Sequence, residues 1–334
     1  MVVVDSYFIA LMMCFITMLC WGSWGNTQKL ASKEWQFQLF YWDYAIGVVL
    51  LSLILAFTMG STGDYGRSFL NDFAQADSGN IWSAFIGGVV FNLSNILLVV
   101  AIDIAGMAVA FTVGVGLALV LGVITNYIGS PVGNPVILFA GVGLVILAII
   151  FNAIAYKKLS GPVKKSSTLG LGLSVVAGIL MGFFYRFVAA SMSVDFKSLE
   201  AGKLSPYTAV VVFSIGLLLS NFIWNSIMMA KPLDGQPVKY SDYIKKGNMK
   251  LHSIGILGGV IWGLGMAFSI IASGPAGFAI SYGLGQGATM VAAFWGVFIW
   301  KEFKDAPPST NRLLTFMFIC FLVGLGLIVY SRFA

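Results

Sequence analysis

Gly87-Gly88-Val89-Val90-Phe91 and Gly258-Gly259-Val260-Ile261-Trp262 are two apolar stretches of this chain that share order as well as composition. The first is followed by a break at Ala105-Gly106 and then by Ala110-Phe111-Thr112-Val113-Gly114-Val115-Gly116. The second is followed by a break at Gly274-Pro275 and then by Ala279-Ile280-Ser281-Tyr282-Gly283-Leu284-Gly285. The two series lie about 170 residues apart, half the chain, which indicates an internal repeat. The alternative is that Gly-rich apolar helices resemble one another by composition alone.

The composition around these stretches is that of a membrane protein. Hydrophobic residues make up 59% of the 334 residues and charged residues 10%, whereas soluble domains are about 25% charged. About 20 apolar residues span the roughly 30 Å hydrocarbon layer of a bilayer. The apolar runs predict ten transmembrane helices and an all-α fold, with helices at 6–27, 37–59, 81–101, 106–128, 135–156, 169–192, 206–230, 251–272, 276–299 and 312–332.

The repeat divides these helices into two sets of five. We expect a first repeat at 1–158, a short linker at 159–168 and a second repeat at 169–334. Because five is an odd number, the second repeat would cross the membrane in the opposite sense to the first. Inverted repeats of this kind are typical of secondary transporters, whose binding site lies near the midplane between the halves.

The basic residues predict the orientation. With the N-terminus outside, about 14 Lys and Arg fall in cytoplasmic loops and about 4 in outer loops, the bias that the positive-inside rule requires. Both termini are therefore predicted to lie outside, with Asp64, Asp72 and Asp77 in an outer loop. The formal charge of +6 follows this topology, so nucleic-acid binding is not expected.

The residue types that carry enzyme chemistry are scarce. Cys14, Cys20 and Cys320 lie in apolar runs, and the one histidine, His252, begins the eighth predicted helix. Neither a metal site nor a nucleophile triad follows from that arrangement, and no phosphate-binding loop occurs. The sequence therefore excludes ATP hydrolysis by a loop of that kind and argues against an enzyme. A channel is a rival class, but no filter segment stands out.

Polar side chains are unevenly distributed among the predicted helices. Residues 136–151 and 313–329 are nearly bare of them, so the fifth and tenth helices are expected to face lipid or a second copy in a homodimer. The other eight helices would enclose a cavity. Aromatic faces with amide and hydroxyl groups suit a neutral polar solute, although aromatics at a helix end can also form an interfacial belt. The candidate substrate-binding residues are Trp21, Trp24, Asn26, Asn92, Asn95, Trp262, Tyr282 and Gln286.

Two charged residues within predicted helices are candidates for coupling and electrostatics, because burying a charge in the bilayer is costly. Asp43 is the candidate carrier of a coupling proton, and its alternative is a permanent ion pair with Lys29 or Arg186. Arg186 would set the electrostatics of the cavity, or serve as a structural clamp. No cofactor other than the coupling ion is expected.

Two motifs carry a family resemblance. Cys20-Trp21-Gly22-Ser23-Trp24-Gly25-Asn26-Thr27-Gln28-Lys29 and Phe40-Tyr41-Trp42-Asp43-Tyr44 resemble the ureide permease and glucose/ribose porter branch of the drug/metabolite transporter superfamily. The resemblance implies two inverted five-helix repeats and proton-linked uptake of sugars, or of ureides and nucleobases. Plant ureide permeases have a longer hydrophilic centre, and the short linker here indicates a bacterial inner-membrane relative.

The leading hypothesis is therefore proton-coupled uptake of a neutral monosaccharide by a multi-pass transporter. The alternative is a ureide or nucleobase permease with the same mechanism. Export of a metabolite is the remaining transport hypothesis, since topology does not fix direction.

Overall fold

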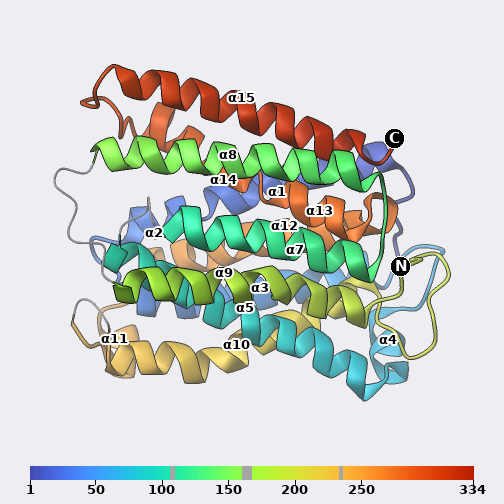
Figure 1. Cartoon of the computed structure of the whole chain (residues 1–334). Coiled ribbons are helices and arrows are strands. Elements are labelled where there is room, and N and C mark those ends of the chain that lie inside the picture. Colours follow the sequence, from blue (N-terminus) through green and yellow to red (C-terminus); the bar gives the residue numbers. More distant parts are fainter. Residues whose placement is uncertain (106–109, 160–167, 233–235) are drawn as a thin grey trace.

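The computed structural model describes residues 1–105, 110–159, 168–232 and 236–334. In these ranges the chain is helical and contains no strand, and its long helices run side by side (Figure 1). Ten helices among the described residues are long and apolar enough to cross a membrane. The predicted fold class, an all-α membrane protein with ten transmembrane helices, is confirmed.

The first half of the chain supplies five of these spans. Its helices are α1 (Tyr7–Ser23), α2 (Gly25–Ala31), α3 (Phe37–Phe57), α4 (Phe69–Gln75), α5 (Ser78–Ala105), the π-helical turn η1 (Phe111–Val115), α7 (Gly116–Gly129) and α8 (Pro135–Leu159). The short helix α2 continues α1 as one span, and η1 continues into α7.

The second half supplies the other five spans. Its helices are α9 (Thr168–Ser191), α10 (Pro206–Ala230), α11 (Tyr240–Lys245), α12 (Met249–Ala276), α13 (Phe278–Gly285), α14 (Ala288–Phe294), the π-helical turn η2 (Trp295–Ile299) and α15 (Ser309–Tyr330). The ninth span is therefore broken into α13, α14 and η2.

Capping side chains explain several of the helix starts. Ser205 accepts a hydrogen bond from the Thr208 amide before α10, and Asn248 accepts one from the Leu251 amide before α12. Each of these two starts lies within a few residues of the predicted one.

The short helices α4 and α11 were not predicted, because seven or six residues give little periodicity. Most of the predicted linker 159–168, and the first four residues of the predicted helix 106–128, lie outside the described residues.

Helix contacts occur in matched pairs across the two halves. Helix α5 packs on α9 and α10, and α12 packs in the same way on α1 and α3. Helices α8 and α15, which have few polar side chains along most of their length, pack on each other at one edge of the bundle (Figure 1). This pairing is what a repeat of five helices would produce, although the inverted repeat and its boundaries stay predictions.

The glycines of the two repeated stretches allow the tightest helix crossings. A Cβ atom built on Gly259 of α12 would lie 2.0 Å from the Tyr44 carbonyl oxygen on α3. A Cβ atom on Gly88 of α5 would likewise lie 2.0 Å from the Phe213 carbonyl oxygen on α10. Only glycine permits backbones to approach so closely, the usual role of small residues between membrane helices.

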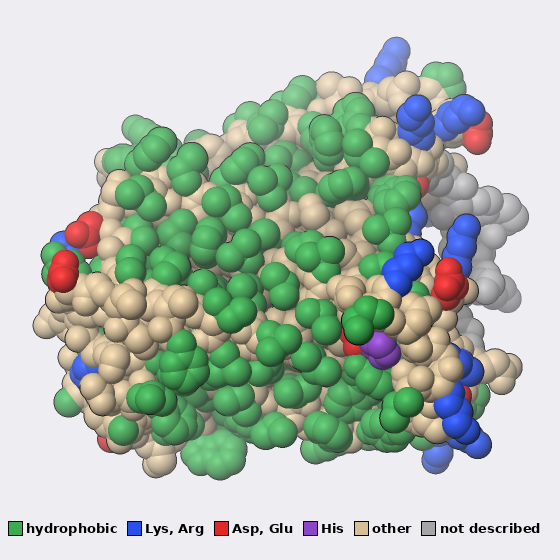
Figure 2. Space-filling view, turned by 180° about the vertical axis from the view of Figure 1, so that it is seen from behind, with side chains coloured by type: hydrophobic (Ala, Val, Ile, Leu, Met, Phe, Trp, Pro, Cys, Tyr) green, Lys and Arg blue, Asp and Glu red, His purple; other side chains and the backbone are tan. Residues whose placement is uncertain are grey.

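The surface divides into an apolar middle and two charged ends. Figure 2 shows hydrophobic side chains over the middle of the face that it presents, with Lys, Arg, Asp and Glu gathered toward both ends. The two chain termini lie at one end, and α2 and α11 lie at the other (Figure 1). The predicted placement of both termini outside the cell is not tested by this arrangement.

Candidate functional site: a central cavity and its vestibule

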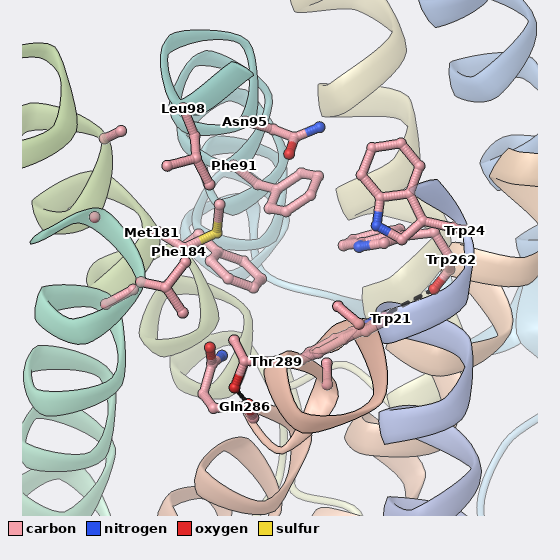
Figure 3. A pocket seen from close by; sticks show the side chains of 16 residues that line it. Trp21, Trp24, Phe91, Asn95, Leu98, Met181, Phe184, Trp262, Gln286 and Thr289 are labelled. Atoms are coloured by element: carbon pink, nitrogen blue, oxygen red, sulfur yellow. Dashed lines mark hydrogen bonds between the residues drawn. The ribbon is translucent and has the colours of Figure 1, made fainter. Parts of the chain in front are cut away.

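A cavity of about 170 Å³ lies among α1, α5, α7, α9, α12 and α14 (Figure 3). Its lining residues come from both halves of the chain, and most lie about halfway along their spans. They are Trp21, Trp24, Phe91, Asn95, Leu98, Gly114, Val115, Ala118, Ala177, Met181, Phe184, Trp262, Gln286, Ala288, Thr289 and Ala292. This is the position expected for the solute site of a secondary transporter.

Two of the spans that line the cavity have irregular helical geometry beside it. The ninth span is interrupted between α13 and α14, and Gln286 lies at that interruption. In the fourth span, the π-helical turn η1 carries Gly114 and Val115, which also line the cavity. Broken spans and single π-turns are frequent at functional sites in helical membrane proteins.

Aromatic rings form one wall of the cavity. The rings of Trp21 and Trp262 stack with centroids 6.0 Å apart and planes at 13°. The Trp21 indole nitrogen donates to the Trp262 carbonyl oxygen at 3.3 Å, which fixes one ring against the other helix. Phe91 also stacks on Trp262, with ring centroids 4.3 Å apart and ring planes at 29°. Such a wall offers flat π surfaces to a bound solute.

Two amide side chains face this wall with unused hydrogen-bonding capacity. Asn95 donates through Nδ2 to the Tyr41 hydroxyl at 3.0 Å, which orients its amide. Among the described residues, no hydrogen bond engages the Asn95 Oδ1 atom or either side-chain polar atom of Gln286. Figure 3 shows Asn95 and Gln286 on opposite sides of the cavity. A solute between them could both donate and accept hydrogen bonds.

A vestibule of about 500 Å³ continues the cavity toward the end of the molecule that carries α2. It shares Trp21, Trp24 and Asn95 with the cavity. Farther out its wall carries an ion pair, Lys29 Nζ to Glu302 Oε1 at 2.8 Å. Both partners are partly exposed, so the pair contributes about 0–1 kcal/mol to stability.

Hydrogen bonds donated by aromatic side chains connect other residues of the vestibule wall. Tyr156 donates to Glu302 Oε2 at 2.9 Å, and Trp300 donates through Nε1 to Asn26 Oδ1 at 2.7 Å. Lys29 Nζ also lies 4.2 Å from the centre of the Trp300 ring. The contacts of Asn26 and Lys29 join the end of the first span to the segment after the ninth, and the Tyr156 contact joins the fifth span to the same segment.

Two fully buried tyrosines, Tyr185 and Tyr282, lie beside the cavity. The rings of Tyr185 and Tyr282 lie 5.2 Å apart. The Tyr185 hydroxyl bonds to Ser269, and the Tyr282 hydroxyl donates to the Ala118 carbonyl oxygen at 3.0 Å. The vestibule therefore connects the cavity to the end of the molecule that carries α2.

The structure brings together six of the eight predicted substrate-binding residues. Trp21, Trp24, Asn95, Trp262 and Gln286 line the cavity, and Asn26 lines the vestibule. The remaining two, Asn92 and Tyr282, are fully buried beside the cavity and do not line it. Asn92 donates to the Ser220 hydroxyl at 2.8 Å and so links α5 to α10.

Asp43 and Arg186 also lie outside the cavity. Asp43 is buried. Trp35 donates to it through Nε1 at 3.1 Å, and the Nδ1 atom of His252 lies 2.9 Å from its Oδ1 atom. It pairs with neither Lys29 nor Arg186, so the alternative of an ion pair with one of them is wrong. The Arg186 guanidinium lies against Gly129, and among the described residues no hydrogen bond or ion pair engages it.

Several residues of the site were not predicted from the sequence. Met181, Phe184 and Thr289 line the cavity, but apolar residues within an apolar helix give no signal. Helix α8, expected to face lipid or a second copy, contributes Asn152 and Tyr156 to the vestibule. Asn152 is polar and lies near the end of that span, so the sequence could have indicated that this end of α8 faces a polar site.

No group of three or more His, Cys, Asp and Glu side chains among the described residues could hold a metal ion. Ten candidate membrane spans around a cavity that continues to one end of the molecule indicate a multi-pass membrane protein with a central solute site.

Comparisons with known proteins agree with that class. The family model described as ureide permease matches residues 40–164 and 155–331. Ureide permease 5 of Arabidopsis thaliana is 22% identical, covering 98% of this chain and 95% of that protein. Ureide permease 1 of the same plant is 22% identical, covering 99% of each. The probable ureide permease A3 of Vigna unguiculata is 22% identical, covering 92% of this chain. The chain belongs to the ureide permease family.

Solved structures share this fold, and a crystal structure of a protein is one of them. It matches with a TM-score of 0.58 at 15% sequence identity, over 98% of this chain and 99% of that chain. At this identity the likeness shows the fold alone.

Proposed function

We propose that this permease is a secondary carrier of small neutral ureides, compounds with urea and amide groups on a compact skeleton. The observation that carries the proposal is the unengaged amide of Gln286, which faces Asn95 across an aromatic cavity in a member of the ureide permease family.

The chemistry of the cavity fits such a solute. A ureide presents N–H donors and C=O acceptors along its edge, and the primary amide of Gln286 offers the complementary acceptor and donors. The Asn95 Oδ1 atom would accept from a second N–H group. The flat faces of a urea or amide ring would lie against the wall of Trp21 and Trp262. Among the described residues that line the cavity none has a charged side chain, which suits a neutral compound.

This proposal adopts the alternative hypothesis from the sequence, a ureide permease, in place of the leading one, a monosaccharide transporter. The relatives are ureide permeases by name, which favours a ureide over a monosaccharide. Hydrogen-bonding capacity alone would accommodate either, because amides bind hydroxyl groups as well as N–H groups. Uptake, a proton as the coupling ion and an inner-membrane location remain parts of the proposal.

Competition binding tests the substrate class. Purified protein would be incubated with a radiolabelled ureide such as allantoin, and bound label measured against rising unlabelled ureides, nucleobases, monosaccharides and polyols. We expect ureides to displace the label at the lowest concentrations, nucleobases more weakly, and sugars not at all. Displacement by a monosaccharide at lower concentrations than by any ureide would contradict the proposal.

A further inference from the structure

The one histidine of the chain is paired with the buried carboxylate. His252 lies in the first turns of α12 and faces α3, where its Nδ1 atom lies 2.9 Å from Asp43 Oδ1. The Asp43 side chain is 1% exposed, and that of His252 is 25% exposed. Figure 2 shows the histidine at the surface, toward the end of the molecule where Lys and Arg side chains gather. The pair therefore joins a buried acid to a base that water reaches.

Two further donors surround the same carboxylate. Tyr243 of α11 donates its hydroxyl to Asp43 Oδ1, and Trp35 donates through Nε1 to Oδ2 at 3.1 Å. Gly255 of α12 lies directly against the Asp43 side chain, where a Cβ atom would come within 2.4 Å of it. The carboxylate is therefore held by groups from three separate segments of the chain.

This arrangement holds one exchangeable proton. With Asp43 ionised, the Nδ1 atom of His252 donates to it, and the Nε2 atom is left to take up or release a proton. A protonated ring makes the pair neutral overall. A neutral ring leaves a single negative charge in a buried site, which is costly to maintain. An imidazole can bind or release a proton at its second ring nitrogen, so the pair has two protonation states.

The neighbouring groups do not supply that proton. Burial, together with the hydrogen bond to Asp43, raises the pKa of Tyr243, so its hydroxyl remains a donor throughout the neutral range. Trp35 does not titrate. The basic residues Lys245, Lys246 and Lys250 lie nearby in the chain, are exposed, and form no ion pair with Asp43 among the described residues.

Helices α3 and α12 connect this pair to the cavity. On α3, Asp43 lies between Tyr41, which accepts the Asn95 hydrogen bond at 3.0 Å, and Tyr44. The Tyr44 ring lies 4.9 Å from that of Trp24 and 6.1 Å from that of Trp262. On α12, the helix that carries His252 also carries Trp262. A change in the charge of the pair therefore acts on the two helices whose side chains support the cavity wall.

The geometry points to the Asp43–His252 pair as the proton-binding site of the transport cycle, separate from the solute cavity and linked to it through α3 and α12. This inference rests on the proposed carrier function and adds the coupling site. The proton binds at His252 Nε2 and leaves from the same atom. In the present conformation the pair and the vestibule open at the same end of the molecule, the end expected to be cytoplasmic.

The test separates solute exchange from proton drive in the same proteoliposomes. Counterflow of a labelled ureide at equal pH on both sides requires exchange alone, whereas accumulation under an imposed pH gradient requires proton coupling. The variants are His252→Asn, whose amide nitrogen replaces Nδ1 as a donor to Asp43, and Asp43→Asn. The matched controls are Lys250→Gln, an exposed base two residues from His252, and Asp305→Asn, an exposed carboxylate at the same end.

We expect His252→Asn to keep counterflow within threefold of wild type and to lose gradient-driven accumulation by at least tenfold. Asp43→Asn should behave in the same way, and both controls should retain both activities. Gradient-driven accumulation by His252→Asn would overturn the inference, and so would loss of counterflow in folded His252→Asn protein. Absence of ureide counterflow in the wild type would instead contradict the proposed function.

Discussion

Trp21 and Trp262 stack with their rings 6.0 Å apart and nearly parallel, and one comes from each half of the chain. The indole of Trp21 also donates to the backbone of the other helix. The cavity wall is therefore formed only when α1 and α12 pack together. A movement between the two halves of the protein would change the wall that contacts the solute.

Replacing Trp21 should weaken solute binding. Trp21→Ala removes one aromatic face from the cavity, and we expect the dissociation constant for a ureide to rise about tenfold, equivalent to about 1.4 kcal/mol. Trp21→Phe should recover part of the loss. Trp82→Ala is the matched control, because Trp82 is 59% exposed on the outer surface of α5. Equal effects of Trp21→Ala and Trp82→Ala on radioligand binding would argue against the aromatic wall.

The two asparagines of α5 should have separable roles. Asn95→Ala removes a cavity amide and should raise the KM of transport several-fold, because a hydrogen bond to the solute is lost. Asn92→Ala removes the bond to Ser220 between helices, worth roughly 0.6 kcal/mol, and should lower thermal stability slightly without changing KM. Transport kinetics and thermal unfolding of both variants check this. The same KM for Asn95→Ala as for wild type would remove Asn95 from the site.

The close crossing of α3 and α12 should not tolerate a side chain. In Gly259→Ala the added methyl group meets the Tyr44 carbonyl oxygen, and we expect a destabilisation of about 1–3 kcal/mol from overpacking. Gly143→Ala in α8 is the control, since a Cβ atom there has no neighbour within 4 Å. Thermal unfolding in detergent measures both. A Gly259→Ala protein as stable as the control would show that the crossing is looser than described.

Much of the fold could be predicted from the sequence because the bilayer imposes a simple length rule. Each predicted span overlaps an observed one, and the starts of α10 and α12 follow from their capping residues. The interruption at Gln286 could not be predicted, since the run around it is apolar and Gly-rich on both sides. Helix breaks of this kind depend on packing partners supplied by other spans.

The candidate site was predicted only in part, because the choice of residues rested on their polar or aromatic character within spans. Polar and aromatic residues within spans pointed to Trp21, Asn95 and Gln286, which do line the cavity. The same rule also selected Tyr282, whose hydroxyl instead bonds to the Ala118 backbone. His252 was passed over because it lies at the start of a span and is distant in sequence from Asp43. Only the folded chain brings those two residues together.

The predicted orientation can be tested by chemical labelling. In a background without Cys14, Cys20 and Cys320, a single cysteine at Asp64 should react with a membrane-impermeant maleimide on intact cells. A single cysteine at Lys245 should react only after the cells are permeabilised. Both side chains are exposed in the structure, so burial would not prevent either reaction. The opposite labelling pattern would show that both termini lie inside.

Counterflow in proteoliposomes is the most direct measurement of the proposed function. Liposomes containing the purified protein would be preloaded with an unlabelled ureide or an unlabelled monosaccharide, and entry of the corresponding labelled compound followed. A carrier of ureides predicts transient accumulation of the labelled ureide above equilibrium, abolished without preloading, and no accumulation of the sugar. Accumulation of the sugar alone, or no counterflow with any ureide in folded protein, would contradict it.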